Sequence, residues 1–231
     1  LGPGAVGSFL GSCFNSKNNN IFCFGRKRSS QFIMQNGIEI KSNFYGNNKF
    51  FPKIKLSKNE NLDYLFITVK AFDLDAALKE YSKVSSNKTI VISLLNGLGY
   101  TEILKKYFNN KIVMGTIGYL EVFIDKNRKV IHKSNKKAHI EIASDNNKFI
   151  YELKGLKNLI NDAHINCEII NNEKNLTWRK LIRLCTISTI TSLANSNLGK
   201  ARSTEPYKSI MKDLVRELCL IAAAENIYFN E

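Results

Sequence analysis

The feature that most constrains this chain is a glycine-rich segment that runs straight into an apolar stretch. The segment follows the pattern Gly-x-Gly-x-x-Gly and consists of Gly2, Pro3, Gly4, Ala5, Val6 and Gly7. In a strand–turn–helix unit such glycines allow a tight turn, close approach of the backbone to a pyrophosphate, and close packing of the helix on the strand. The stretch from Ala5 to Phe14 predicts the helix, whose first amides would bind the phosphate. An ordinary turn is the alternative. The chain opens inside this motif, so we expect the first strand to precede Leu1.

Apolar runs of strand length alternate with helix-like segments over the first half of the chain. The predicted strands cover residues 21–24, 64–69 and 89–95, and the predicted helices cover residues 73–81 and 100–108. The strand runs are apolar throughout rather than at alternate positions, which is typical of parallel strands covered on both faces. The sequence therefore predicts an α/β fold with a Rossmann-type, doubly wound and mostly parallel sheet.

Shorter segments complete this part of the chain. Residues 31–55 mix apolar and polar positions, which predicts a hairpin excursion. Alternating apolar residues at 130–132 and 138–143 predict antiparallel strands added late to the sheet. The asparagine-rich segments 17–20 and 146–148 are expected to be loops.

The pattern changes to helical spacing near residue 171. Apolar positions at this spacing predict long helices over 176–193 and 206–224, with Asn197-Leu198-Gly199 as the break between them. We therefore expect two domains. Residues 1–170 would bind the nucleotide, and residues 171–231 would form part of an all-helical domain for substrate binding and dimerisation.

Composition narrows the class of partner. The formal net charge is +14, but the basic residues are spread along the whole chain, so a solvated basic surface is favoured over a nucleic-acid site. No stretch of 18 apolar residues is present, so no membrane partner is expected. Five cysteines in no paired or zinc-type spacing indicate a reducing cytoplasm, buried cysteines and no metal site.

A basic turn follows the second predicted strand. It reads Gly25-Arg26-Lys27-Arg28, with no acidic residue. A dinucleotide fold that prefers NAD places Asp or Glu here for the ribose 2′-hydroxyl, whereas an arginine nearby meets the 2′-phosphate of NADP. Arg26 is thus the candidate for the phosphate, and a solvated basic turn is the alternative. The predicted cofactor is NADPH.

Two polar residues follow successive predicted strands. Lys70 comes after the strand that ends at Val69, and Asn96 follows Leu95. Ligands of open parallel sheets bind outside the carboxyl ends of the strands. An amide there can both donate to and accept from a nicotinamide, its ribose or a substrate oxygen. Each residue alone would be an ordinary loop position, but together they favour a site.

A lysine near the start of the first long helix is the candidate acid. Lys180 lies in Thr177-Trp178-Arg179-Lys180-Leu181, in a helix with an apolar face. A lone helical lysine is usually solvated. A partly desolvated one can donate a proton, because burial lowers the pKa of an ammonium group.

Five segments together resemble the ketopantoate reductase family. They are GPGAVG from Gly2, VKAFD around Lys70, LLNGLG around Asn96, VMGTIGYLE from Val113, and TWRKL around Lys180. The resemblance implies a Rossmann-type domain, an all-helical domain, and NADPH-dependent reduction of a 2-oxo acid, ketopantoate first among them. It implies that Lys180 donates the proton, that Asn96 touches cofactor and substrate, and that Lys70 lies beside the nicotinamide. A homodimer is a possible assembly.

The chain departs from the family pattern after Lys180. The family's well-studied branch has asparagines one and two turns later, where this chain has Leu184 and Ser188. A leucine cannot replace an amide that bonds the substrate, whereas Ser188 is still a candidate substrate ligand. Two alternatives therefore stay open: a reductase of another small carbonyl compound, and an NADP(H)-binding sensor without turnover.

Overall fold

The computed structural model describes residues 1–57, 60–144 and 149–229, and the chain forms two compact units. Leu1–Leu95 with Gly99–Glu173 make the first unit, and Asn96–Leu98 with Lys174–Glu231 make the second. The predicted loop at 146–148 lies outside the described residues. The nucleotide-binding and substrate-binding roles expected for the two domains stay predictions.

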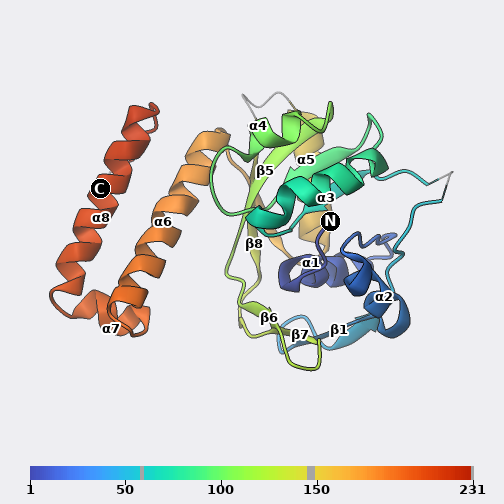
Figure 1. The fold of residues 1–231 in the computed structure, drawn as a ribbon, viewed down its shortest axis with the longest axis horizontal. Coiled ribbons are helices and arrows are strands. Elements are labelled where there is room, and N and C mark those ends of the chain that lie inside the picture. Colours follow the sequence, from blue (N-terminus) through green and yellow to red (C-terminus); the bar gives the residue numbers. More distant parts are fainter. Residues whose placement is uncertain (58–59, 145–148, 230–231) are drawn as a thin grey trace. The chain divides into compact units, whose positions relative to one another are not determined.

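The first unit is built on a five-stranded sheet (Figure 1). Its strands lie in the order β3-β4-β5-β8-β9, and β8 is antiparallel to β5 while the other neighbours are parallel. The bounds are β3 (Tyr64–Ile67), β4 (Ile90–Ser93), β5 (Lys111–Gly118), β8 (His139–Ala143) and β9 (Asn166–Ile169). The predicted α/β class with a mostly parallel sheet is confirmed.

Helices cover both faces of this sheet, because side chains of a strand point alternately to its two sides. Ile92 of β4 belongs to one buried cluster with residues of α1 (Ala5–Asn15) and α5 (Ile150–Asp162). Val91 belongs to a second cluster with α3 (Leu74–Tyr81) and α4 (Tyr100–Lys105). All four residues of β4 are buried, which explains why residues 90–92 are apolar without alternation. Each such side chain contributes roughly 1.5–3 kcal/mol of burial free energy.

A second, four-stranded sheet holds the excursion. Its order is β2-β1-β7-β6, with bounds β1 (Ile38–Ser42), β2 (Asn48–Phe50), β6 (Val122–Ile124) and β7 (Val130–His132). The hairpin expected within 31–55 is the antiparallel pair β1–β2. Residues 138–143 join β5 of the main sheet as predicted. For 130–132 the strand and an antiparallel pairing, with β6, are confirmed, but the sheet is not the predicted one. β7 lies in the second sheet, where it also pairs parallel to β1, because Val130 and Ile40 share the buried cluster that includes Phe9 of α1.

The strand predicted at 21–24 is reduced to a single parallel bridge between Phe22 and Lys53. Cys23 and Phe24 are buried as an inner strand requires. Few backbone hydrogen bonds join this segment to the chain on its two sides. Cys23 N donates to Lys53 O at 2.8 Å on one side, and Phe24 O accepts from Gly2 N at 2.9 Å on the other. The apolar pattern thus predicted the burial correctly and the strand incorrectly.

The second unit is helical. It contains α6 (Glu173–Leu193), α7 (Leu198–Ser203) and α8 (Tyr207–Ala224). Asn197 caps α7, since its side chain accepts a bond from Lys200 N at 3.0 Å. Trp178 and Ile182 of α6 pack against Ala222 and the residues around it. None of the helices within the described residues is long and apolar enough to cross a membrane.

The cysteines are free thiols, and three of them are buried. Burial raises the pKa of Cys13 to about 12, of Cys23 to about 11 and of Cys167 to about 12. A thiol with so high a pKa is a poor nucleophile and metal ligand. These cysteines therefore act as small core side chains, as predicted.

Candidate functional site

The glycine turn is fixed by two close approaches of backbone to backbone. Gly2 has φ +88°, and a Cβ there would lie 2.7 Å from the backbone nitrogen of Val69. A Cβ on Gly7 would lie 2.5 Å from both Gly2 O and Thr68 Oγ1. Thr68 Oγ1 itself donates to Gly2 O at 2.8 Å. Only glycine fits these two positions, so the helix start is held tightly against the loop that follows β3.

Gly4 is different, because it faces open space. A Cβ added there would meet nothing within 4 Å. Gly4 is also the N-cap of α1, and no acidic residue lies in the first turn of that helix. The first amides of a helix have no partner within the helix, so Ala5 and Val6 present N–H donors beside this open place. The arrangement suits the pyrophosphate of a dinucleotide.

Arg26 lies where the basic turn was expected, at the N-cap of α2 (Lys27–Asn36). Its side chain is 74% exposed and forms an ion pair with Asp73. Asp73 ends the short helix η1 (Ala71–Asp73), which follows β3. The pair joins the loop after the 21–24 segment to the loop after β3. The sequence did not predict that an acid would engage Arg26.

Lys70 is exposed and caps the start of η1, three residues after β3 ends. Next to it, Phe72 is 83% exposed. A large aromatic side chain in solvent beside a predicted nucleotide site is a candidate for stacking on a base. Sequence reasoning missed Phe72, because an apolar residue inside an α/β sequence is normally assigned to the core.

Asn96 is exposed and follows β4 by three residues. Since β3 and β4 are adjacent and parallel, Lys70 and Asn96 follow the same ends of two paired strands. Asn96 belongs to the second compact unit, together with Gly97 and Leu98. Its contact with cofactor and substrate stays a prediction.

The proposed acid, Lys180, is half-buried on α6. Trp178, Ile182, Thr186 and Ile190 form the buried face of this helix. Lys180 lies about 200° around the helix from Trp178, so it is on the other side. Leu184 and Ser188 share its face, and Ser188 Oγ donates to Cys185 O at 3.2 Å. The roles of Lys180 and Ser188 stay predictions.

A cavity of about 480 Å³ in the first unit borders the glycine turn at Gly2, Pro3 and Gly7. It lies between the extended segment Ile21–Phe24 and the strand residues Tyr64–Phe66, with Leu1 at its edge. Leu1 makes backbone bonds to the end of β3, at 2.7 Å to Phe66 O and 2.9 Å from Thr68 N. The cavity is thus bounded by strand backbone, and the expectation that a strand precedes Leu1 stays a prediction.

One group of side chains has the composition of a metal site. His139 and Glu141 of β8 and Glu168 of β9 place ligand atoms within 4.8 Å of one another. Glu141 also accepts a bond from Thr116 Oγ1 at 3.2 Å. His139 and Glu141 are partly buried, and Glu168 is exposed; exposed acidic groups are common without a metal ion.

Two family models match most of the chain. The model described as "Ketopantoate reductase PanE/ApbA" matches residues 1–145, and the one described as "Ketopantoate reductase PanE/ApbA C terminal" matches residues 172–231. The chain belongs to the ketopantoate reductase family. This confirms the resemblance that the five sequence segments carried.

Individual relatives are distant but span nearly all of the chain. "Uncharacterized oxidoreductase YkpB" of Bacillus subtilis is 22% identical over 98% of this chain and 75% of its own length. A 2-dehydropantoate 2-reductase of Streptococcus pyogenes is 22% identical over 100% of this chain and 75% of its own. The structure of D-mandelate dehydrogenase with NADH and anilino(oxo)acetate matches with a TM-score of 0.88 at 21% identity, covering 99% of this chain and 74% of that one. At this identity the structural likeness shows the fold.

Members of the ketopantoate reductase family are oxidoreductases that bind a nicotinamide cofactor. The geometry of the glycine turn agrees with this, because no Cβ fits at Gly2 or Gly7 and the space beside Gly4 is open.

Proposed function

We propose that this chain reduces a 2-oxo acid to a 2-hydroxy acid with NADPH, and that ketopantoate is the first substrate to test. The observation that carries the proposal is the glycine turn. Its helix start has donors beside Gly4, no acid in the first turn, and no side chain in the way. The family match supports the reaction class.

The cofactor would lie across the carboxyl ends of the strands. Gly4 and the amides of Ala5 and Val6 would hold the pyrophosphate, and Lys70 would lie nearer the nicotinamide. Arg26, which forms an ion pair with Asp73, would lie at the adenosine side. When bound, the reduced nicotinamide supplies the hydride.

The helical unit would supply the proton. Lys180 would donate a proton to the carbonyl oxygen as that oxygen becomes an alkoxide, and the ammonium charge would stabilise the developing anion. Asn96 would hold the carbonyl in position. The carbonyl carbon gains the hydride and its oxygen gains the proton, which gives a 2-hydroxy acid and NADP⁺.

The substrate is the finer part of the proposal. D-mandelate dehydrogenase was crystallised with anilino(oxo)acetate, and mandelate, like pantoate, is a 2-hydroxy acid. Leu184 makes the Lys180 face of α6 less polar than an asparagine would, which favours a 2-oxo acid with a more apolar side chain as the second candidate. NADP(H) binding without turnover is the remaining alternative, motivated by the same residue.

A panel of 2-oxo acids, ketopantoate included, tests the proposal directly. Each is incubated with the chain and NADPH, the loss of NADPH absorbance is followed, and the hydroxy acid is identified by mass spectrometry. We expect turnover of at least one member. Tight NADPH binding with no turnover of any member would instead support the sensor alternative.

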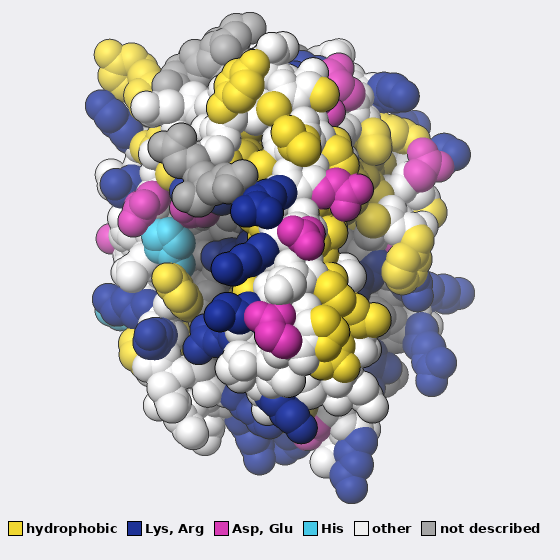
Figure 2. Space-filling view, turned by 90° about the vertical axis from the view of Figure 1, so that its left-hand side faces the viewer, with side chains coloured by type: hydrophobic (Ala, Val, Ile, Leu, Met, Phe, Trp, Pro, Cys, Tyr) yellow, Lys and Arg dark blue, Asp and Glu magenta, His cyan; other side chains and the backbone are white. Residues whose placement is uncertain are grey.

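Other expectations about partners stay predictions. Figure 2 shows Lys and Arg side chains spread over one face with Asp and Glu among them, in line with a net charge of +14 that is not concentrated in one segment. Absence of nucleic-acid and membrane binding, a cytoplasmic location and a homodimer are each still to be tested.

A further inference from the structure

The peptide group between Pro3 and Gly4 is the part of the glycine turn that packing holds least. A Cβ at Gly4 would meet nothing within 4 Å, whereas a Cβ at Gly2 would lie 2.7 Å from the backbone nitrogen of Val69. Gly4 is also exposed. A glycine without close neighbours has a wide range of backbone conformations. The orientation of the Pro3–Gly4 peptide must therefore be set by hydrogen bonds.

A buried serine holds the carbonyl end of this peptide. Ser8 lies on α1 and is 3% exposed, and its Oγ donates to Pro3 O at 3.2 Å. The backbone nitrogen of Ser8 donates to Gly4 O at 2.9 Å. One residue of α1 thus holds two successive carbonyl oxygens of the turn. The hydroxyl bond costs stability if it is lost, because Ser8 Oγ would then be buried without it.

A threonine after β3 holds the amide end of the same peptide through Gly2. Gly4 N donates to Gly2 O at 2.7 Å, and Thr68 Oγ1 donates to the same oxygen at 2.8 Å. Thr68 Oγ1 also lies 3.1 Å from Leu1 O. The single hydroxyl proton favours the shorter contact, because Leu1 O already accepts from Thr68 N at 2.9 Å. A carbonyl oxygen has two lone pairs, so these two donors satisfy Gly2 O.

Pro3 is itself held by its ring, which fixes its φ angle. A Cβ at Gly25 would lie 2.8 Å from Pro3 Cδ, so the ring rests on the backbone of Gly25. Gly25 is buried, and its carbonyl oxygen accepts from Tyr81 Oη at 2.8 Å and from Ser30 Oγ at 3.1 Å. With the ring fixed, the freedom that is left is rotation of the Pro3–Gly4 peptide. That rotation would break the bonds at both of its ends.

We propose that Ser8 and Thr68 are positioning residues for the pyrophosphate of the cofactor, an inference that rests on the proposed function. Their hydroxyls keep the carbonyl oxygens of Pro3 and Gly2 bonded within the protein. If the Pro3–Gly4 peptide rotated, a carbonyl oxygen with its partial negative charge would turn towards the open place beside Gly4. A phosphate would be repelled there. The two hydroxyls thus prepare the turn before the cofactor arrives, which lowers the cost of binding.

Calorimetry with ADP, which carries a pyrophosphate group, and fluorescence titration with NADPH measure the effect on binding. Ser8→Ala and Thr68→Val each remove one hydroxyl donor. Each should weaken both ligands by about three- to tenfold, the usual effect of losing one hydrogen bond. Thr68→Ser keeps the hydroxyl, so its affinities should stay within about twofold of those of the wild type. Rescue by serine would show that the hydroxyl, and not the shape of the threonine, is required.

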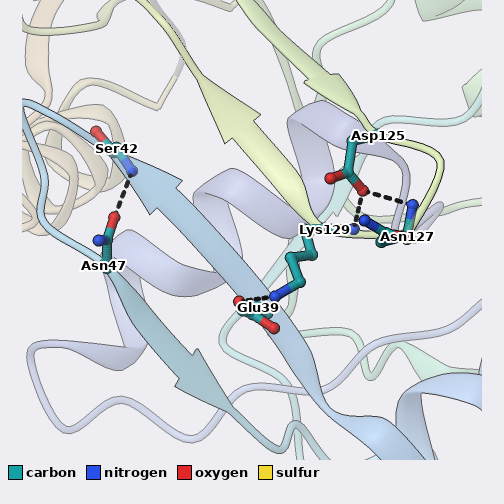
Figure 3. A network of polar contacts seen from close by, with 6 residues as sticks. All are labelled: Glu39, Ser42, Asn47, Asp125, Asn127 and Lys129. Carbon is teal, nitrogen blue, oxygen red and sulfur yellow. Dashed lines mark hydrogen bonds and ion pairs between the residues drawn. The ribbon is translucent and has the colours of Figure 1, made fainter.

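The matched control removes a bond of the same kind from the second sheet. Figure 3 shows this bond, in which Asn47 Oδ1 accepts from the backbone nitrogen of Ser42 at 3.1 Å. Asn47→Ala should lower the melting temperature about as much as Ser8→Ala does, because each variant loses one bond between a side chain and the backbone. It should leave the affinity for ADP unchanged. A merely structural role of Ser8 would give the two variants the same affinity.

Three results would overturn the inference while the proposed function stands. They are wild-type affinity for ADP in either Ser8→Ala or Thr68→Val, equal weakening of ADP in Asn47→Ala, and a Thr68→Ser variant that binds as weakly as Thr68→Val. A wild type that binds neither ADP nor NADPH would overturn both the inference and the proposed function.

Discussion

The glycine turn and helix α6 represent two ways of building a functional site. In the turn, function depends on backbone shape: Gly2 and Gly7 are held where no Cβ fits, and Gly4 is left open. On α6, function would depend on which side chain stands at three positions of one helix face, Lys180, Leu184 and Ser188. Backbone shape can be read from packing, whereas side-chain chemistry on a helix must be tested by substitution.

The largest effect should come from closing the turn. Gly7→Ala would place a Cβ 2.5 Å from Gly2 O, and overpacking of this kind should lower the free energy of unfolding by about 3 kcal/mol. NADPH binding should be lost with it. Chemical denaturation and fluorescence titration with NADPH measure the two effects.

Gly4→Ala is the matched control for the turn. Its Cβ meets nothing within 4 Å, so stability should fall by less than about 1 kcal/mol. NADPH should nevertheless bind more weakly, since the methyl group stands where the phosphate approaches. If Gly4→Ala and Gly7→Ala lose stability equally, the distinction between a closed and an open glycine is wrong.

The next effect concerns α6. Leu184→Asn would put an amide one turn after Lys180, and kcat/KM for ketopantoate should rise by up to about tenfold, the value of one added hydrogen bond. Leu193→Asn, an exposed position near the end of the same helix, should leave it unchanged. A rise for both variants, or for neither, would contradict a substrate contact on the Lys180 face.

A smaller effect is the pH dependence of stability that should arise from His132, which packs against α1. His132 is buried, its Nδ1 lies 2.8 Å from Ser42 Oγ, and its ring stacks on Phe9 of α1 with centroids 5.0 Å apart. Burial lowers the pKa of His132 below the usual 6.5. Below about pH 6.5 the unfolded chain therefore binds more protons than the folded one, and stability should fall by up to about 1.4 kcal/mol per pH unit.

Urea unfolding between pH 5 and pH 8 measures this dependence. The contribution of His132 to the free energy of unfolding should be constant above about pH 6.5, the pKa in the unfolded chain, and should decline as the pH drops below it. His132→Gln should flatten the decline, while the exposed His164→Gln should not. An unchanged slope in His132→Gln would show that other groups cause it.

The smallest effect is expected for the exposed ion pair beside the turn. Arg26→Ala should lower the free energy of unfolding by no more than about 1 kcal/mol, because solvent screens the pair and both side chains lose freedom to form it. Thermal melting at low and high salt measures it. A loss well above this value would mean that Arg26 holds the loops together more firmly than its exposure suggests.

Much of the main sheet could be predicted, because β4 is buried at every position and β3 consists of apolar and aromatic residues, of which Leu65 and Ile67 are buried. β5 was missed although five of its residues are buried in a row. Gly115 interrupts the pattern of β5, and a Cβ there would lie 2.7 Å from Leu94 Cδ2, so the side chain of Leu94 occupies the space that the glycine leaves. That constraint comes from a neighbouring strand and has no local sequence signal.

Helices α2 and α5 were missed for a related reason. α2 buries only Ile33 along its length, so its sequence shows almost no apolar face. α5 carries Gly155 in mid-helix, where Tyr64 Oη lies 3.6 Å from the place of a Cβ. In both cases tertiary packing, rather than helix propensity, decides the local structure.

The candidate site, too, could be predicted from the sequence only in part. The glycine turn, the basic turn and the residues after β3 and β4 could be located from sequence order alone, since strand ends in a parallel sheet face one edge. The pairing of Arg26 with Asp73, the exposure of Phe72 and the packing of Arg128 over the ring of Phe32 could not. The two contacts join segments that are far apart in the sequence.

The central claim is that NADPH held by the glycine turn would give its hydride to the carbonyl carbon of a 2-oxo acid, and that Lys180 would give a proton to the carbonyl oxygen. Its most direct test compares Lys180→Ala with Lys174→Ala, an exposed lysine on the same helix, by NADPH affinity and by turnover of the best 2-oxo acid. The account predicts that Lys180→Ala lowers kcat by about 10²- to 10⁴-fold with NADPH affinity unchanged, and that Lys174→Ala leaves both unchanged. Wild-type turnover by Lys180→Ala would contradict it.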